Sequence, residues 1–146
     1  MRVGEVMRQA LVTVRPDAPA RIAADLMKSC QVRHLPVIED GERLVGILTD
    51  RDLEHSAFLP MLARQLKWEE RRLSAPRVRD IMTWDVVTVE PDYDLVRAGL
   101  LMFERRIGSL PVIEGGRLVG IVTGRDLLEA LAAVTGGHAP AELYLG

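Results

Sequence analysis

The chain has 146 residues, of which 48% are hydrophobic and 27% charged, with a net charge of -2 and an isoelectric point near 5.9. This hydrophobic content excludes a disordered chain, which would combine low hydrophobicity with high net charge. The slightly acidic balance gives no overall positive field, which argues against a nucleic-acid reader and against a protein drawn to an anionic membrane.

An internal repeat dominates the sequence. Residues 3–53 align with residues 78–127, with about half of the positions identical and only Glu42 unmatched. The sequence therefore predicts a duplicated unit. We expect a first motif over residues 1–58, a helical linker over 59–76, a second motif over 77–134 and a C-terminal tail over 135–146.

Each motif is predicted to begin with a short β-branched strand and a helix. The strand spans Leu11–Val14 in the first copy and Val86–Val89 in the second. The segments Asp17-Ala18-Pro19 and Asp92-Tyr93-Asp94 lead into the helix, and aspartate there suits a helix N-terminus, by capping or by opposing the helix dipole. Apolar residues at helical spacing predict buried stripes at Ile22, Ala23, Leu26, Met27 and Cys30, and, less regularly, at Val96, Leu100, Leu101 and Phe103. Cys30, the one cysteine, is expected to be inert core filler.

A hairpin and a second helix complete each motif. Glycine turns at Asp40-Gly41-Glu42 and Gly115-Gly116 join two nearly apolar strands. The strands are expected at Leu35–Ile38, Leu44–Leu48, Leu110–Ile113 and Leu118–Val122. Such strands need cover on both faces, and a unit of about 55 residues buries little apolar surface alone. The predicted fold class is α/β (α+β), with two β-α-β-β-α units packed about a pseudo-twofold axis.

The linker carries apolar residues at helical spacing, and Trp68 lies among its charges. Trp68 is expected either to pack against its own domain or to contact a second subunit.

Each second helix begins with the pattern Thr-x-x-Asp, at Thr49–Asp52 and Thr123–Asp126. The segments Gly46–Asp52 and Gly120–Asp126 resemble the Gly-apolar-apolar-Thr-x-x-Asp signature of CBS domains, the regulatory modules named after cystathionine β-synthase. Asp80-Ile81-Met82-Thr83 resembles the usual opening of that family, and Gly4-Glu5-Val6-Met7-Arg8 is a looser version. The resemblance covers nearly the whole chain except the linker and the tail.

The resemblance implies two motifs back to back with two clefts between them. In the family these clefts often hold adenosine-containing ligands, most commonly AMP, ADP or ATP and in some members S-adenosylmethionine. No obligatory cofactor and no metal are expected. The resemblance also implies a flat antiparallel dimer.

Two interpretations of Thr-x-x-Asp remain open. The pattern is a capping box, and it is also a ligand site in which a helix N-terminus holds a phosphate, an arginine adds charge and the aspartate accepts from a ribose diol. The candidate ligand-binding residues are Thr49, Arg51, Asp52, Thr123, Arg125, Asp126, His34, Pro36, Ser109, Pro111, Val12 and Val87. Surface ion pairs are the alternative for the two arginines, and a surface or hydrogen-bonded histidine is the alternative for His34. Because Ser109 replaces His34 and Gly124 replaces Asp50, the copies are expected to be unequal.

No catalytic or metal-binding pattern occurs, because His34, His55 and His138 lack ligand spacing and no phosphate-loop motif is present. The expected function is a stand-alone regulatory or sensor module that binds an adenosine-containing ligand, and the alternative is a ligand-free dimerisation or protein-interaction module. An enzyme that hydrolyses the nucleotide is a further rival. We expect a homodimer, with Leu127, Leu128, Leu131 and Val134 at its interface, an unknown regulated protein and, from the single cysteine, a cytoplasmic location.

Overall fold

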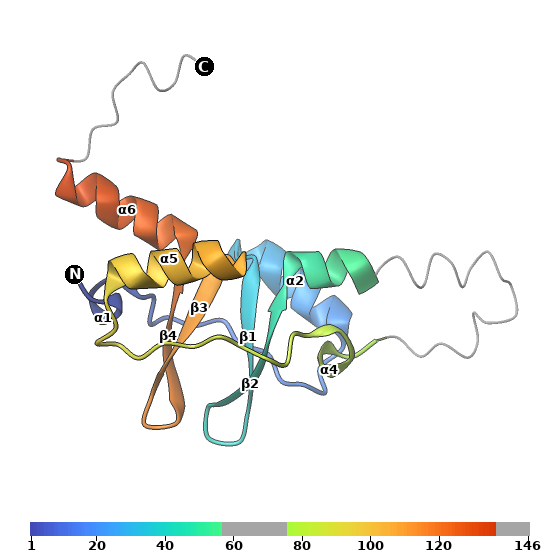
Figure 1. Cartoon of the computed structure of the whole chain (residues 1–146). Helices are drawn as coiled ribbons and strands as arrows, with labels where there is room; N and C mark the ends of the chain where they lie inside the picture. The colour runs from blue at the N-terminus through green and yellow to red at the C-terminus, as the bar shows by residue number, and fades with distance from the viewer. Residues whose placement is uncertain (57–75, 137–146) are drawn as a thin grey trace, which may run out of the picture. The chain divides into compact units, whose positions relative to one another are not determined.

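The computed structural model describes residues 1–56 and 76–136, and it mixes helices with two small antiparallel sheets, as expected (Figure 1). Apart from Pro76, the linker expected over 59–76, with Trp68, lies outside the described residues, as does the tail beyond Gly136. Within the described ranges, no helix combines the length and the hydropathy needed to cross a membrane.

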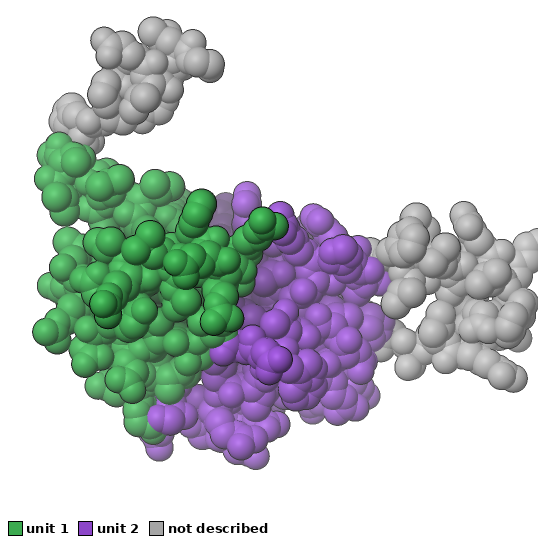
Figure 2. Space-filling view, in the orientation of Figure 1, with its two compact units in different colours: residues 1–10, 87–115, 119–146 green, residues 11–86, 116–118 purple. Residues whose placement is uncertain are grey.

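The chain divides into two compact units that do not follow the order of the sequence (Figure 2). Unit 1 combines Met1–Ala10, Val87–Gly115 and Val119–Gly146. Unit 2 combines Leu11–Val86 and Gly116–Leu118. Each unit therefore joins the opening residues of one sequence motif to the body of the other motif.

Unit 1 is built on the second motif. Its elements are α1 (Val3–Val6), α5 (Leu95–Arg105), β3 (Ser109–Glu114), most of β4 (Arg117–Thr123) and α6 (Gly124–Val134). The opening residues are bound to the body by backbone hydrogen bonds, from Val3 N to Tyr93 O at 2.9 Å and from Gly4 N to Pro91 O at 2.8 Å. The core consists of Val3, Val89, Leu95, Ala98, Met102, Leu110, Val112 and Val122.

Unit 2 is built on the first motif in the same way. Its elements are α2 (Ala20–Cys30), β1 (His34–Glu39), β2 (Arg43–Thr49), the helical residues 50–56 and α4 (Val78–Ile81). Val78 N donates to Ala18 O at 2.9 Å, and Arg79 N donates to Pro16 O at 2.9 Å. The core consists of Val14, Ala23, Met27, Leu35, Val37, Leu48, Val78 and Met82.

The unmatched residue Glu42 lies in the turn between β1 and β2. Gly41 and Glu42 both adopt the left-handed conformation, with φ of 72° and 66°. The pairing of β1 with β2 shifts between Val37 and Ile38, which is a bulge. In the other hairpin, Gly115 and Gly116 fill both left-handed positions at no steric cost.

The first strand of each motif is shorter than the sequence predicts. Val14 forms a single parallel bridge to Val37, and Val89 forms one to Val112. The helix starts also differ from each other. Asp94 caps α5 by accepting from Arg97 N at 3.0 Å, whereas Pro19 occupies the cap position of α2, so neither Asp17 nor Asp92 is a cap residue.

The buried stripes of α2 and α5 differ from the prediction. Cys30 is exposed and Ile22 is 43% exposed, so Cys30 is not core filler. In α5 the buried residues are Leu95, Ala98 and Met102, while Val96, Leu100 and Phe103 point outward. Because α5 carries apolar residues on two faces, the spacing of these residues alone predicted the wrong face to be buried.

The opening residues of each motif lie against a glycine in a strand. Arg8 forms an antiparallel bridge to Ile121 of β4, and Thr83 forms the equivalent bridge to Ile47 of β2. A Cβ at Gly120 would lie 2.5 Å from Met7 Sδ, and a Cβ at Gly46 would lie 2.5 Å from Met82 Sδ. These two glycines therefore permit the close approach of the opening residues.

Candidate ligand site

Thr49 and Asp52 form a reciprocal capping box at the start of the helix that follows β2. Asp52 N donates to Thr49 Oγ1 at 3.3 Å, and Thr49 N donates to Asp52 Oδ2 at 2.9 Å. The capping interpretation of the pattern is therefore present in the structure. It leaves Asp52 Oδ1 without a hydrogen bond among the described residues.

The backbone N–H groups at this helix start are all engaged within the protein. Asp50 N donates to Arg33 O at 3.0 Å, and Arg51 N donates to Asp50 Oδ1 at 3.0 Å. The N–H groups of Thr49 and Asp52 belong to the capping box. A phosphate at this position would have to displace one of these bonds or rely on the Arg51 side chain, which is exposed.

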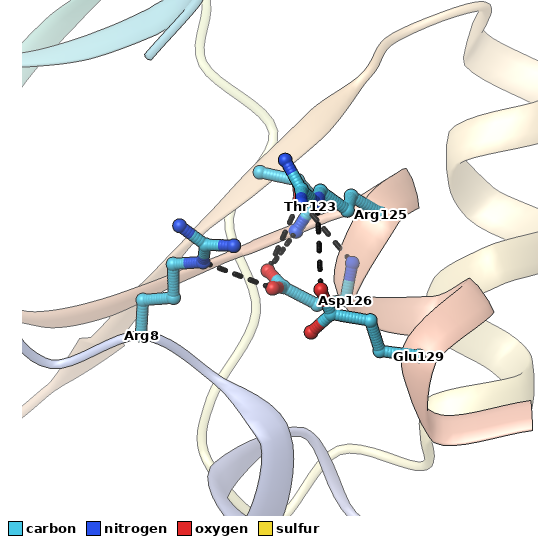
Figure 3. Close-up of polar contacts among 5 residues, drawn as sticks. All are labelled: Arg8, Thr123, Arg125, Asp126 and Glu129. Carbon is cyan, nitrogen blue, oxygen red and sulfur yellow. Dashed lines mark hydrogen bonds and ion pairs between the residues drawn. The ribbon is translucent and has the colours of Figure 1, made fainter. Parts of the chain in front are cut away.

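Thr123 and Asp126 repeat the capping box with additional bonds (Figure 3). Asp126 Oδ2 accepts from Thr123 N at 2.8 Å and from Thr123 Oγ1 at 3.1 Å, and Asp126 N donates to Thr123 Oγ1 at 3.4 Å. Asp126 Oδ1 pairs with Arg8 Nε at 3.1 Å. Within the described part of the chain, Arg125 N makes no such bond, so this copy keeps one first-turn N–H group open.

The two arginines of the pattern lie at the surface. Arg125 Nε pairs with Glu129 Oε1 at 3.3 Å across one helical turn of α6, and both side chains are mostly exposed. An exposed pair of this kind contributes about 0–1 kcal/mol, so it can exchange for a ligand anion. Arg51 makes no ion pair with any residue in the described ranges.

His34 lies beside the first copy of the pattern, since it is the register partner of Thr49 in the β1–β2 ladder. Burial lowers the pKa of His34 below its usual value near 6.5; Asp50 opposes this shift, Arg33 adds to it and Asp52 opposes it. His34 is therefore mainly neutral at neutral pH and offers a hydrogen bond rather than a fixed positive charge. Its counterpart Ser109 is buried.

The apolar residues among the ligand-binding candidates are divided between the two units, as the Thr-x-x-Asp pairs are. Val12 packs against the core of unit 2, and Val87 packs against the core of unit 1. Pro36 and Pro111 are fully buried. In this conformation the two prolines therefore present no surface to a ligand. No group of acidic, histidine or cysteine residues suited to a metal occurs among the described residues.

Arg8 is the residue at this site that sequence reasoning missed. It belongs to the opening of the first motif but lies in unit 1, beside the helix start of the second motif. The equivalent opening position of the second motif is Thr83. The sequence contained one sign of this role, since Arg8 stands where the opening Asp80-Ile81-Met82-Thr83 of the second motif has a threonine.

The chain matches a known family over most of its length. The model of the CBS domain matches twice, over residues 3–56 and residues 78–133. A CBS domain-containing protein of Dictyostelium discoideum is 34% identical over 133 residues, which cover 90% of this chain and 92% of that protein.

Other relatives carry the same region within a longer chain. Inosine-5'-monophosphate dehydrogenase of Methanocaldococcus jannaschii is 32% identical over 129 residues, which cover 88% of this chain but 23% of the enzyme. The match to that catalytic protein is therefore limited to a minor part of it.

Solved structures share the fold. The structure of CBSX2 in complex with AMP has a TM-score of 0.78 and 31% sequence identity, and the match covers 92% of this chain and 98% of that chain. The expected tandem arrangement of two motifs is thus confirmed as a fold class.

Proposed function

Because this chain belongs to the CBS domain family and carries two copies of the domain, we propose that it is a regulatory or sensor module that binds an adenosine-containing ligand. The ligand class is that of AMP, ADP and ATP, with S-adenosylmethionine as a further possible effector. Thr49 and Asp52 in one unit and Thr123 and Asp126 in the other are the residues we assign to it. If AMP and ATP compete for one site, the module would sense the energy state of the cell.

The observation that carries this proposal is the open carboxylate of Asp52. An ionised carboxylate only accepts hydrogen bonds, and its acceptor positions suit the two hydroxyl groups of a ribose. Thr49 fixes the carboxylate through one oxygen and leaves Oδ1 open. The related CBSX2 structure, which contains AMP, supports the same ligand class.

A thermal-shift experiment tests the proposal. AMP, ADP, ATP and S-adenosylmethionine are added to the protein at rising concentrations, with inorganic phosphate, which lacks the ribose diol, as the control. A ligand that binds only the folded state raises the melting temperature in a concentration-dependent way, so at least one adenosine ligand should do so. If none of the four ligands raises the melting temperature more than the control does, the result favours the alternative function, a ligand-free dimerisation or protein-interaction module.

We propose that the bound nucleotide is not turned over. The Thr and Asp residues of each pair are bonded to one another within a helix cap, and among the described residues no histidine is hydrogen-bonded to a hydroxyl group. Incubation of AMP or ATP with the protein should leave the nucleotide intact. We expect the module to act on a regulated protein, and the cytoplasmic location expected from the single cysteine stays a prediction.

We also propose a homodimer that uses an apolar face of unit 1. Helices α5 and α6 are in contact, and both expose large apolar side chains. The exposed fractions are 71% for Val96, 55% for Leu100, 82% for Phe103, 68% for Leu128, 60% for Leu131 and 71% for Val134. Leu127, the fourth residue expected there on α6, instead packs partly buried against the unit 1 core.

The first motif provides a natural contrast, because the positions of Val96, Leu100 and Phe103 hold Arg21, Asp25 and Lys28 there. Contiguous exposed apolar surface is characteristic of an interface, and a second copy of the chain is the partner that we propose.

Light scattering at micromolar concentration should give the mass of a dimer. The triple variant Val96→Arg, Leu100→Asp, Phe103→Lys copies the polar surface of α2 onto α5, so it should give a monomer with an unchanged circular dichroism spectrum. A monomeric natural chain, or a triple variant that still dimerises, would contradict this interface.

A further inference from the structure

We infer that Arg8 makes the two sites unequal by occupying the carboxylate of Asp126, so that Asp52 is open to a diol and Asp126 is withheld from one. This inference rests on the proposed function, because it concerns which of the two assigned aspartates receives the ribose. Arg8 is thus a specificity-determining residue, because it decides which of the two sites can bind a ribose diol.

Counting acceptor positions gives the first argument. A carboxylate offers about four lone-pair positions for hydrogen bonds. Asp126 accepts three hydrogen bonds, from Thr123 N, from Thr123 Oγ1 and from Arg8 Nε. Asp52 accepts one hydrogen bond from the described residues, from Thr49 N. Two ribose hydroxyl groups therefore fit on Asp52, whereas on Asp126 they fit only if an existing donor leaves.

Access gives the second argument. The Asp126 side chain is 3% exposed, and that of its partner Arg8 is 48% exposed. Asp52 is half-buried and keeps part of its surface open. Of the donors on Asp126, Thr123 belongs to the helix cap, so Arg8 is the one that can leave with least disturbance.

The backbone holds Arg8 in this position. Arg8 N donates to Ile121 O at 2.9 Å, and Ile121 N donates to Arg8 O at 3.1 Å. Thr83 makes the same two bonds with Ile47, at 2.9 Å and 3.0 Å. The two positions thus share one backbone arrangement and differ in the side chain they present, which is a charged guanidinium in one copy and a short hydroxyl in the other.

Exchanging these side chains provides the experiment. Titration calorimetry with AMP and with 2'-deoxy-AMP, which lacks the vicinal diol, is carried out on the natural chain and on the variants Arg8→Thr and Thr83→Arg. The same ligands are titrated into Asp52→Asn and into Asp52→Asn with Arg8→Thr, where the remaining binding reports on Asp126. Arg105→Thr, which removes an exposed arginine from the end of α5, is the charge control.

In the Asp52→Asn background, Arg8→Thr should raise the affinity for AMP about tenfold or more, because the freed acceptor of Asp126 bonds to the diol. The affinity for 2'-deoxy-AMP should rise less. Thr83→Arg should lower the affinity of the Asp52 site for AMP about tenfold, and the control should change neither value. Arg8→Met, an unbranched side chain that has no hydrogen-bond donor, repeats the test if Arg8→Thr does not fold.

The inference is overturned if the natural chain binds AMP and the affinity in the Asp52→Asn background stays the same after Arg8→Thr and after Arg8→Met. A different result, in which AMP does not bind to the natural chain or to any variant, removes the proposed function and this inference with it. The two failures are therefore distinguishable in one set of titrations.

Discussion

Gly120→Ala should lower the free energy of unfolding by about 1–3 kcal/mol, the usual cost of adding a methyl group where no space exists. The new Cβ would lie 2.5 Å from Met7 Sδ, 2.9 Å from Met7 Cγ and 3.1 Å from the carbonyl oxygen of Arg8. The thioether can rotate away, but the backbone oxygen is fixed by its hydrogen bond to Ile121 N. The opening residues would therefore have to move away from β4.

Gly124→Ala is the matched control, because nothing lies within 4 Å of a Cβ at that position and it is the first residue of α6. Alanine is also the better helix former, so the control should unfold at the same or a higher denaturant concentration. Urea unfolding of both variants and of the natural chain measures the difference. Equal midpoints for the two variants would show that β4 does not need a glycine for this packing.

Gly120→Ala also carries a consequence for the ligand site. If the opening residues shift, the Arg8 guanidinium moves away from Asp126, since its backbone is bonded to Ile121. The variant should then share part of the AMP-binding behaviour of Arg8→Thr. The backbone bridge between Arg8 and Ile121 therefore links the close packing at Gly120 to the availability of the Asp126 carboxylate.

Much of the local structure could be predicted from the sequence. The hairpins lie where the glycine turns indicated, because left-handed positions such as those of Gly115 and Gly116 strongly favour glycine. The reciprocal bonds of Thr49 with Asp52 follow from their spacing of three residues at a helix start. Signals of this kind are local, and each depends on a few neighbouring residues.

The features that the sequence could not predict are non-local. Val3 and Val78, from the openings of the two motifs, are core residues, and the spacing of apolar residues in the sequence does not say which core each one joins. Both repeats have similar openings, so the sequence is equally compatible with an opening that packs on its own motif. The Arg8–Asp126 pair depends on that choice, since 118 positions separate the two residues.

Asp52→Asn should weaken AMP binding by about tenfold or more, because a hydrogen bond to a charged group contributes about 1.5–3 kcal/mol. In the natural chain Thr49 N donates to Asp52 Oδ2 at 2.9 Å, and the amide oxygen of asparagine can still accept this hydrogen bond. The other oxygen becomes an amide nitrogen, which donates hydrogen bonds and cannot accept one from a ribose hydroxyl. Binding should therefore fall while the helix cap is retained.

Two controls separate the loss of a ligand contact from a general effect. Asp25→Asn removes the same charge from the exposed face of α2 and should bind AMP as the natural chain does. Thr49→Ala removes the hydroxyl that accepts from Asp52 N and should cost about 1 kcal/mol of stability through the weakened cap. Calorimetric titration and urea unfolding give both quantities for each variant.

The pattern of the two measurements decides between the two interpretations of Thr-x-x-Asp. A ribose contact predicts that Asp52→Asn loses affinity for AMP with little change in the unfolding midpoint, and that its affinity for 2'-deoxy-AMP falls much less. A purely structural capping box predicts the reverse, with AMP bound as in the natural chain and a lower midpoint. Because the cap engages one oxygen of Asp52 and leaves the other open, we expect the first pattern at Asp52. At Asp126, where Arg8 and Thr123 already occupy both oxygens, the same substitution should change AMP binding far less.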